Sequence, residues 1–273
     1  MGACLSSKPE TYIDNNDGGE EAFHNRFLED RILGEGQFGV VTLVHDMTAN
    51  NGEGELMACK TLKKGVVFKD NVLYTPLKPS AMQAECGILR ALAGKQYCLD
   101  LVAIFETPKV LLMVTEYCSG GEMMEYVSKQ EELRTEDASR IAFQLLSAVH
   151  HCATKNVLHR DIKPENTMFK DPTRGAELRL IDFGSGTIDS PDRSPDEFHE
   201  TFAGTAFYIS PEMFQHKYGQ KADVWSAGAT ILVLVCGYPA GQVSVPFVLP
   251  FCFALLFRAH SDKLCRFCFC FCW

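Results

Sequence analysis

Four polar residues within residues 159–184 have the types and the spacing of a site that handles phosphate and a metal ion. Asp161, Lys163 and Asn166 fall on one short loop, and Asp182 follows after a stretch that reads as a buried hairpin. Carboxylate and amide oxygens suit a hard cation, and an ammonium group neutralises phosphate charge. Each residue alone would be an ordinary surface group. Together they predict the chemistry of phosphoryl transfer.

The segment HRDIKPEN and the later triplet DFG resemble the catalytic loop and the metal-binding loop of eukaryotic protein kinases, and the resemblance extends over residues 27–239. It implies that Asp161 accepts the proton of the substrate hydroxyl and that Lys163 neutralises the γ-phosphate of ATP. Asn166 and Asp182 would hold Mg²⁺. A lysine two residues after the acid resembles Ser/Thr kinases rather than Tyr kinases, so the expected substrates are Ser and Thr of proteins.

A glycine pattern precedes these residues. Gly34, Gly36 and Gly39 form G-x-G-x-x-G, which is a weak signal by itself. The following run VVTLV alternates and is β-rich, so the loop is predicted to join two antiparallel strands, whereas a dinucleotide site needs a helix there. The resemblance implies a flap over the ATP phosphates made of Leu33, Gly34, Glu35, Gly36, Gln37, Phe38 and Gly39.

A lysine and a glutamate further along could form the ion pair that positions ATP. Lys60 ends the predicted strand LMACK, and Glu85 lies on a predicted helix over residues 80–92, on the same face as Leu89 and Leu92. A Glu on such a helix commonly faces solvent. With Lys60 upstream, the resemblance favours a Lys60–Glu85 pair in which the lysine binds the α- and β-phosphates.

The adenine site is predicted from the segment EYCSGGE, which resembles a kinase hinge. Backbone groups of Glu116 and Cys118 would bond adenine, Glu122 would meet the ribose or a basic substrate, and Thr115 would stand at the back of the pocket. Apolar side chains would sandwich the adenine ring, and these are Val41, Ala58 and Met168.

The segment from Asp182 to Glu212 is expected to be an activation segment. Arg160 could pair with a phosphate on Thr201, or a built-in acid could supply that charge, from Asp196, Glu197 or Glu200. Thr205 would bridge toward Lys163.

Supporting roles are implied for residues around the same loops. His159 is expected to pack against Phe183, Leu89 and Ile104, and Asp223 to cap the backbone of the catalytic loop. Glu122 and Glu165 would favour a basic residue upstream of the target Ser or Thr.

The elements that must position these residues resemble a bilobal α+β fold with a small β-rich N-lobe and a mostly helical, incomplete C-lobe. Amphipathic and apolar patterns predict helices over residues 135–154 and 223–235. The expected parts are a flexible segment (1–26), the N-lobe (27–115), the hinge (116–121), a partial C-lobe (122–239) and a tail rich in Phe and Cys (240–273).

The tail departs from the family pattern after Pro239. It is interpreted first as out-of-frame or intron-derived sequence, with a membrane segment and a metal site at its cysteines (Cys265, Cys268, Cys270, Cys272) as alternatives. Without the remaining C-lobe helices, the competing hypothesis is a non-catalytic, ATP-binding or membrane-tethered fragment.

The composition and the N-terminal sequence indicate which partners and which cellular location to expect. A net charge of −9 argues against a nucleic-acid partner and is compatible with a basic peptide. Twelve cysteines without a signal peptide indicate free thiols and a cytoplasmic location. The start MGACLSSK permits myristoylation of Gly2 and palmitoylation of Cys4, hence peripheral membrane attachment; an ordinary flexible end is the alternative.

One subgroup of kinases shares further sequence motifs with this chain. The hinge, the run YGQKADVWSAG and the triplet GYP most resemble the calcium/calmodulin-dependent kinase group, including calcium-dependent protein kinases. No EF-hand sequence is recognisable, so direct calcium control is not predicted.

Overall fold

The computed structural model describes most of the chain between residues 19 and 236. The described ranges are 19–36, 39–48, 54–64, 67–69, 72–74, 79–129, 133–190, 192–194 and 197–236. The acylation sites Gly2 and Cys4 and the predicted tail therefore lie outside the described residues. The chain divides into two compact units, and residues up to Met82 with Leu101–Tyr117 make the first.

The first unit is built on a five-stranded antiparallel sheet in the order β1-β2-β3-β7-β6. Its strands are β1 (Phe27–Gly36), β2 (Gly39–Asp46), β3 (Glu55–Lys63), β6 (Leu101–Glu106) and β7 (Val110–Glu116). The run VVTLV lies in β2, so the glycine pattern joins two antiparallel strands as the alternation predicts. A small hairpin, β4 (Val67–Lys69) with β5 (Val72–Tyr74), occupies part of the predicted insertion before the next helix.

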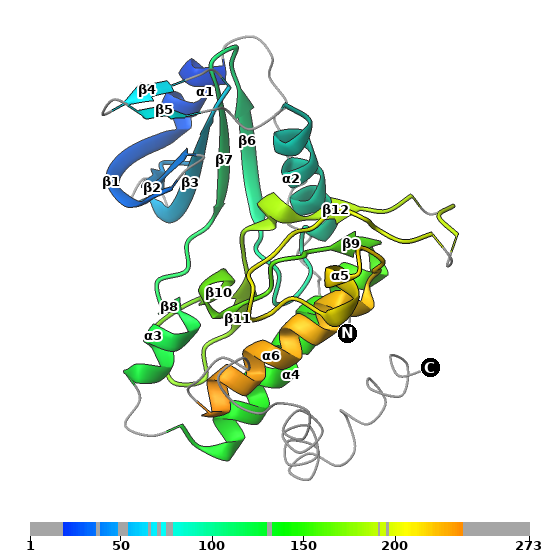
Figure 1. Cartoon of the computed structure of the whole chain (residues 1–273). Coiled ribbons are helices and arrows are strands. Elements are labelled where there is room, and N and C mark those ends of the chain that lie inside the picture. The colour runs from blue at the N-terminus through cyan, green and yellow to red at the C-terminus, as the bar shows by residue number, and fades with distance from the viewer. Residues whose placement is uncertain are drawn as a thin grey trace, which may run out of the picture. The chain divides into compact units, whose positions relative to one another are not determined.

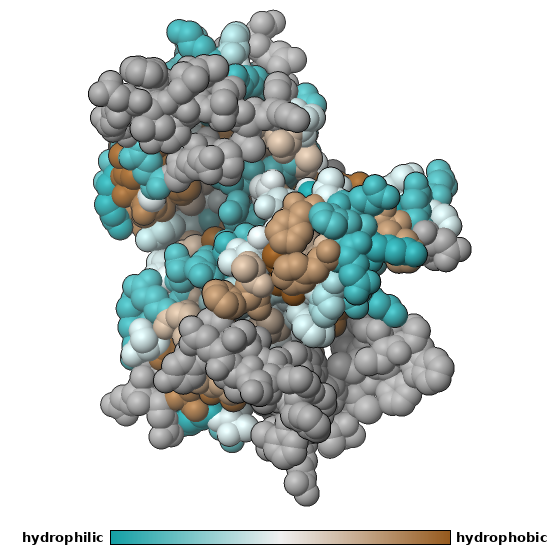
Figure 2. Space-filling model, viewed as in Figure 1, coloured by the Kyte–Doolittle hydropathy of each residue, from teal (hydrophilic) through white to brown (hydrophobic). Residues whose placement is uncertain are grey.

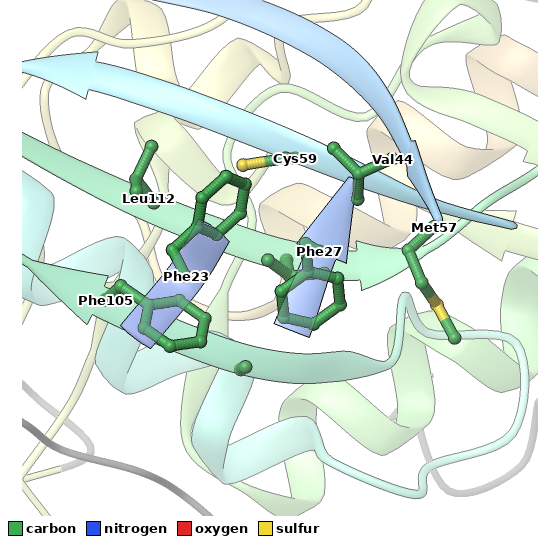
Figure 3. Packing of buried hydrophobic residues seen from close by; sticks show 9 residues of the cluster. Phe23, Phe27, Val44, Met57, Cys59, Phe105 and Leu112 are labelled. Atoms are coloured by element: carbon green, nitrogen blue, oxygen red, sulfur yellow. The ribbon is translucent and has the colours of Figure 1, made fainter. Parts of the chain in front are cut away.

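A helix at the start of the described chain corrects the prediction that residues 1–26 are flexible throughout. α1 (Gly19–Arg26) buries Phe23 completely. Phe23 stacks on Phe27 with ring centroids 5.4 Å apart and meets the edge of Phe105 at 5.5 Å (Figure 3). Arg26 donates to the buried carboxylate of Asp46 at 2.6 Å. Burial of aromatic surface holds this helix, because its own sequence has little amphipathic pattern.

The second unit is mainly helical and contains Gln83–Asp100 and the described chain from Cys118 onward. Its helices are α2 (Pro79–Leu92, from Gln83 on), α3 (Met123–Ser128), α4 (Thr135–Thr154), α5 (Pro211–Phe214) and α6 (Lys221–Cys236), with 3-10 turns η2 (Pro164–Asn166) and η3 (Phe183–Ser185). Short strands lie between them: β8 (Gly121–Glu122), β9 (Val157–Leu158), β10 (Thr167–Phe169), β11 (Leu178–Leu180) and β12 (Thr187–Ile188).

α4 and α6 pack side by side in this unit (Figure 1). α4 has the predicted bounds, and the apolar stripe of Ile141, Leu145 and Ala148 is buried. α6 is apolar nearly all round and buried over most of its length, as predicted. Its buried hydroxyl groups stay satisfied by donating to carbonyl oxygens four residues back, Ser226 at 3.1 Å and Thr230 at 2.9 Å.

No helix among the described residues is long and apolar enough to cross a bilayer.

Candidate active site

A hairpin brings two of the predicted metal ligands to the same end of a small sheet. β10 and β11 pair antiparallel with Thr167 opposite Leu180. Asn166 directly precedes β10, and Asp182 follows β11 after one residue. The backbone N–H of Ile181 donates to the carbonyl of Asn166 at 3.0 Å, which continues the pairing toward the two ligands. The antiparallel register therefore explains why residues 16 positions apart could serve one cation.

Asp161, Lys163 and Thr205 form a closed triangle of polar contacts. The Thr205 hydroxyl donates to Oδ1 of Asp161 at 2.7 Å, and Lys163 Nζ lies 2.9 Å from Oδ2 of the same carboxylate. Lys163 Nζ also donates to the Thr205 hydroxyl oxygen at 2.9 Å. The hydroxyl thus donates its single hydrogen to Asp161 and accepts a hydrogen bond from Lys163. The predicted bridge from Thr205 to Lys163 is present, and the carboxylate accepts a hydrogen bond from an alcohol group.

Asn166 is held against the same carboxylate. Its Nδ2 donates to the backbone oxygen of Asp161 at 2.8 Å and to Oδ2 at 3.0 Å. Because both bonds use the amide nitrogen, the side-chain oxygen is the atom suited to bind a cation. The side chain is buried, which fixes this orientation.

Asp182 lies at a constrained backbone position beside a second acid. Its φ is 58°, a left-handed conformation that is uncommon for a residue with a side chain. A Cβ on Gly184 would lie 3.3 Å from Oδ1 of Asp182 and 3.6 Å from Oε2 of Glu85, so both carboxylates point toward that glycine. Glu85 is buried on α2.

These donors fit Mg²⁺, because that ion prefers oxygen ligands and commonly uses one or two carboxylates together with nucleotide phosphates. Among the described residues, no group of three or more His, Cys, Asp and Glu side chains could hold a metal by itself. A cation held by Asp182 and Asn166 would complete its coordination with water or phosphate oxygens.

A buried acid on α6 supports the catalytic loop as predicted. Oδ2 of Asp223 accepts the backbone N–H of His159 at 2.7 Å, and Oδ1 accepts that of Arg160 at 2.9 Å. Burial raises the pKa of the Asp223 carboxyl, and these two hydrogen bonds oppose the rise. The His159 ring contacts Phe183 at a centroid distance of 4.8 Å and its Nε2 lies 2.9 Å from the carbonyl of Ile181. His159 is therefore a packing residue here.

Arg160 connects the catalytic loop to the activation segment. Its Nη1 donates to the Thr201 hydroxyl at 3.1 Å, and its other nitrogens donate to the carbonyls of Ser185 at 2.6 Å and Gly186 at 3.1 Å. Arg160 therefore contacts residue 201 through its hydroxyl group, and pairing with a phosphate at Thr201 stays a prediction. Gly204 permits the close approach of this segment, since its φ is 98° and a Cβ there would lie 2.6 Å from the carbonyl oxygen of Arg160.

In the first unit, the predicted nucleotide residues share one face of the sheet. Val41 pairs with Lys60, and Ala58 pairs with Thr115. Directly paired residues lie on the same face, and Ala58 and Lys60 are two positions apart on β3. The Thr115 hydroxyl donates to the carbonyl of Ala58 at 3.4 Å. The opposite face carries the core that Phe23 and Phe27 cover.

The glycine flap and the hinge are partly described. Leu33, Gly34, Glu35 and Gly36 end β1 and Gly39 begins β2, whereas Gln37 and Phe38 lie outside the described residues. Glu116 ends β7, and Cys118 is buried in the second unit.

Glu122 and Met168 are paired across β8 and β10. Lys60 and Glu85 belong to different units, so their ion pair stays a prediction.

Glu122 lies near other carboxylates in the second unit. Partial burial raises the pKa of Glu122, and the charges of Glu165 and Glu125 raise it further. Neighbouring carboxylates repel one another, so a cationic side chain placed among them would relieve that repulsion.

The predictions missed three residues that the structure groups within the activation segment. Asp189, Arg193 and His199 contact one another through their side chains. Their spacing matches no motif, so the only sequence signal was the presence of ionisable residues in a segment expected to carry regulation.

Comparisons with known proteins agree with this geometry. Residues 27–244 match the family described as Protein kinase domain. Calcium-dependent protein kinase 10 of Oryza sativa subsp. japonica is 33% identical over 220 residues, 80% of this chain and 34% of the relative. Calcium-dependent protein kinase 31 of Arabidopsis thaliana is 34% identical over 211 residues, 76% of this chain and 41% of the relative. The Arabidopsis CDPK-related kinase 7 is 31% identical over 232 residues, 85% and 38% of the two chains. The chain thus spans about two fifths or less of the length of these relatives.

Proposed function

Because the chain belongs to the protein kinase family and its resemblance lies with calcium-dependent kinases, we propose that it transfers the γ-phosphate of ATP to Ser or Thr of protein substrates. The observation that carries the proposal is the triangle of Asp161, Lys163 and Thr205. It combines a proton acceptor for an alcohol with a cation for phosphate, which are the two groups that the reaction needs from the protein.

Each residue of the site has a defined part in this proposal. Asp161 orients the substrate hydroxyl and takes its proton, in the position where Oδ1 now accepts the hydroxyl of Thr205. Lys163 neutralises charge on the phosphate that moves, and Thr205 holds Lys163 and Asp161 at fixed separation. Asn166 and Asp182 would hold Mg²⁺, which when bound supplies electrostatic stabilisation of the phosphate oxygens.

The first unit would bind the nucleotide. Lys60 would hold phosphates and pair with Glu85, while the face that carries Val41, Ala58 and Thr115 would receive the adenine ring. This assignment is supported by the register of the strands, which places these residues on one face.

Peptide selection follows from charge. Glu122 and Glu165 lie in the same acidic neighbourhood, as the raised pKa of Glu122 indicates. We propose that the enzyme prefers a basic residue upstream of its target Ser or Thr.

A paired measurement of binding and transfer tests the function. We expect ATP with Mg²⁺ to raise the melting temperature and to support transfer of labelled phosphate to a peptide with Arg upstream of Ser. Asp182→Asn should abolish transfer, because it removes a carboxylate ligand of the cation. Asp192→Asn is the matched control, since it makes the same chemical change at an exposed position of the same segment.

The outcomes separate the competing hypotheses. Stabilisation by ATP without transfer would support a non-catalytic nucleotide-binding protein. Transfer that survives in Asp182→Asn at the level of Asp192→Asn would refute the assignment of the site.

A further inference from the structure

Three side chains of the activation segment meet at one ring nitrogen. Nε2 of His199 lies 2.9 Å from Oδ1 of Asp189 and 2.6 Å from Nη1 of Arg193. Nη1 of Arg193 also donates to the same oxygen of Asp189 at 2.6 Å. The side chains of His199, Asp189 and Arg193 are only 12%, 13% and 20% exposed. Water therefore screens these contacts weakly, and a change of charge here has a larger effect than on an open surface.

The two neighbours of this nitrogen require opposite states of Nε2, because the guanidinium needs a lone pair there and the carboxylate needs a hydrogen. A neutral imidazole with a lone pair on Nε2 accepts a hydrogen bond from the guanidinium of Arg193. A protonated imidazole instead donates to the carboxylate of Asp189 and repels Arg193. Nε2 cannot accept from the guanidinium and donate to the carboxylate at once. A protonated ring always carries hydrogen on Nε2, so protonation removes the neutral form that accepts from Arg193.

The surroundings of the ring favour its neutral form. Burial lowers the pKa of His199, the carboxylate of Asp189 opposes that fall, and the cations Arg193 and Arg160 add to it. The ring of Tyr218 covers the imidazole with a centroid distance of 5.4 Å. These four residues are the titratable and charged groups that face the ring in the described part of this unit.

The backbone of His199 is connected to the catalytic loop through two residues. Its N–H donates to the carbonyl of Tyr218 at 2.8 Å, and the N–H of Tyr218 donates back at 3.3 Å. The Tyr218 hydroxyl donates to the carbonyl of Thr201 at 2.7 Å, and Arg160 donates to the Thr201 hydroxyl at 3.1 Å. Since Arg160 directly precedes Asp161, this chain of contacts connects His199 to the loop that carries the proposed catalytic base.

Asp189 is connected to the same loop from the other side. It follows β12, which pairs antiparallel with β9 just before the catalytic loop (Figure 1). The backbone N–H of Asp189 donates to the carbonyl of Asn156 at 2.8 Å. The backbone that carries the Asp189 carboxylate is therefore held by strand pairing beside the catalytic loop.

We propose that His199 is a proton-operated switch in the activation segment, with the neutral ring holding Arg193 in place and the protonated ring displacing it. Protonation adds a positive charge beside Arg193 and Arg160. The carboxylate of Asp189 then accepts a hydrogen bond from the imidazolium in place of the one from Arg193. Arg193 then releases the carbonyl of Glu197, residues 197–201 loosen, and Arg160 loses its partner at Thr201. The expected consequence for turnover, which rests on the proposed kinase function, is a loss of activity on acidification.

An NMR titration of the histidine Cε1–H signals tests the switch without any need for catalysis. His199→Gln identifies the signal by its disappearance. Asp189→Asn should lower the titration midpoint of His199, because the imidazolium loses its acceptor. Arg193→Gln should raise the midpoint, because it removes a neighbouring cation. Midpoints that do not move in these directions would overturn the proposal.

A pH profile of turnover tests the consequence. Glutamine at position 199 can still form hydrogen bonds but cannot be protonated, so His199→Gln should match the wild type at pH 8. Because the pKa of His199 is lowered, the profile has to extend to pH 5. The loss of kcat/KM between pH 8 and pH 5 should be smaller in His199→Gln than in the wild type by about threefold or more. His216→Gln is the control, because His216 instead approaches the carbonyl of Glu200 at 2.7 Å in the same segment.

The two failures are distinguishable. Shifted midpoints without phosphate transfer would refute the proposed function and leave the switch standing. Parallel acid losses in the wild type and His199→Gln would refute the switch, whatever the activity of the enzyme.

Discussion

Replacing Thr205 by valine isolates the contribution of one hydroxyl group to the proposed reaction. Valine keeps the β-branched shape of threonine but removes both the hydrogen that Asp161 accepts at 2.7 Å and the oxygen that Lys163 approaches at 2.9 Å. The side chain of Lys163 then has one anchor fewer, and the carboxylate of Asp161 can rotate away from the substrate hydroxyl.

The expected loss of activity in Thr205→Val can be estimated because both hydrogen-bond partners of the hydroxyl, Asp161 and Lys163, are charged. A hydrogen bond to a charged group contributes about 1.5–3 kcal/mol. If that contribution positions groups in the transition state, its loss lowers kcat/KM by roughly 10- to 150-fold. Thr205 is only partly buried, so the free energy of unfolding should change by no more than about 1 kcal/mol.

Thr205→Ser is the matched variant, because serine keeps the hydroxyl and loses only the methyl group. Initial rates on a basic peptide should place Thr205→Ser within a few-fold of the wild type and Thr205→Val far below it. Equal rates for the two variants would show that the methyl group or the backbone, rather than the hydroxyl, matters at this position. A value for Thr205→Val within about twofold of the wild type would refute the positioning role.

Two further predictions concern α1. Phe23→Ala should lower the free energy of unfolding by about 3–5 kcal/mol in urea titrations, since it leaves a cavity among buried rings, whereas Leu28→Ala, at a residue 59% exposed, should cost about 0.5 kcal/mol or less. Burial opposes the lowered pKa of Asp46, but hydrogen bonds from Arg26 and Thr48 outweigh it. A lowered folded-state pKa stabilises the fold above the unfolded value of about 3.9 and loses that effect as pH falls through the folded value. Arg26→Gln should therefore destabilise at pH 7, and its difference from the wild type should shrink below about pH 4; a constant difference would contradict the ion pair.

The local sequence pattern is sufficient to predict a helix where the spacing of its apolar residues or its overall apolar composition determines how it is buried. α4 was predicted with its observed bounds because its apolar residues recur at helical spacing and polar residues fill the other face. α6 could be recognised because a helix that is apolar nearly all round has to be buried. The catalytic-loop residues can be predicted from their types and intervals, and the structure brings Asp161 into contact with Lys163 and Thr205; their roles stay predictions.

Local pattern failed where a distant part of the chain decides. The sequence of α1, GEEAFHNR, offers one large apolar side chain, which is too little for a helical pattern. Its partner Phe105 comes from a strand more than 80 residues later, so burial of Phe23 could not be foreseen from the segment itself.

The cluster around His199 was missed for a related reason. The ring meets Asp189 only because β12 is paired with β9 and the chain turns back at Tyr218. Neither contact leaves a spacing signal in the sequence.

Several aromatic residues of the second unit are exposed although their residue type predicts burial. Figure 2 shows apolar atoms at the surface beside polar ones, and the exposed large side chains of the described residues include Phe202, Phe207 and Phe214. Composition alone would assign such residues to a core. Phe202 and Phe214 instead lie with ring centroids 5.9 Å apart while each stays more than half exposed.

The geometry of the site depends on a contact between the catalytic loop and a residue far along the chain. Arg160 and Asp182 both have positive φ, at 67° and 58°, and such conformations cost about 1–3 kcal/mol each unless the surroundings enforce them. Asp223, which lies 63 residues beyond Arg160 on α6, accepts the N–H of Arg160 and helps to enforce the first of these. The N–H of Ile181 donates to the carbonyl of Asn166 beside the second. The residue types of the site can thus be predicted from a short segment, but their positions require α6 to be folded against α4, because the carboxylate that holds the loop is part of that buried helix.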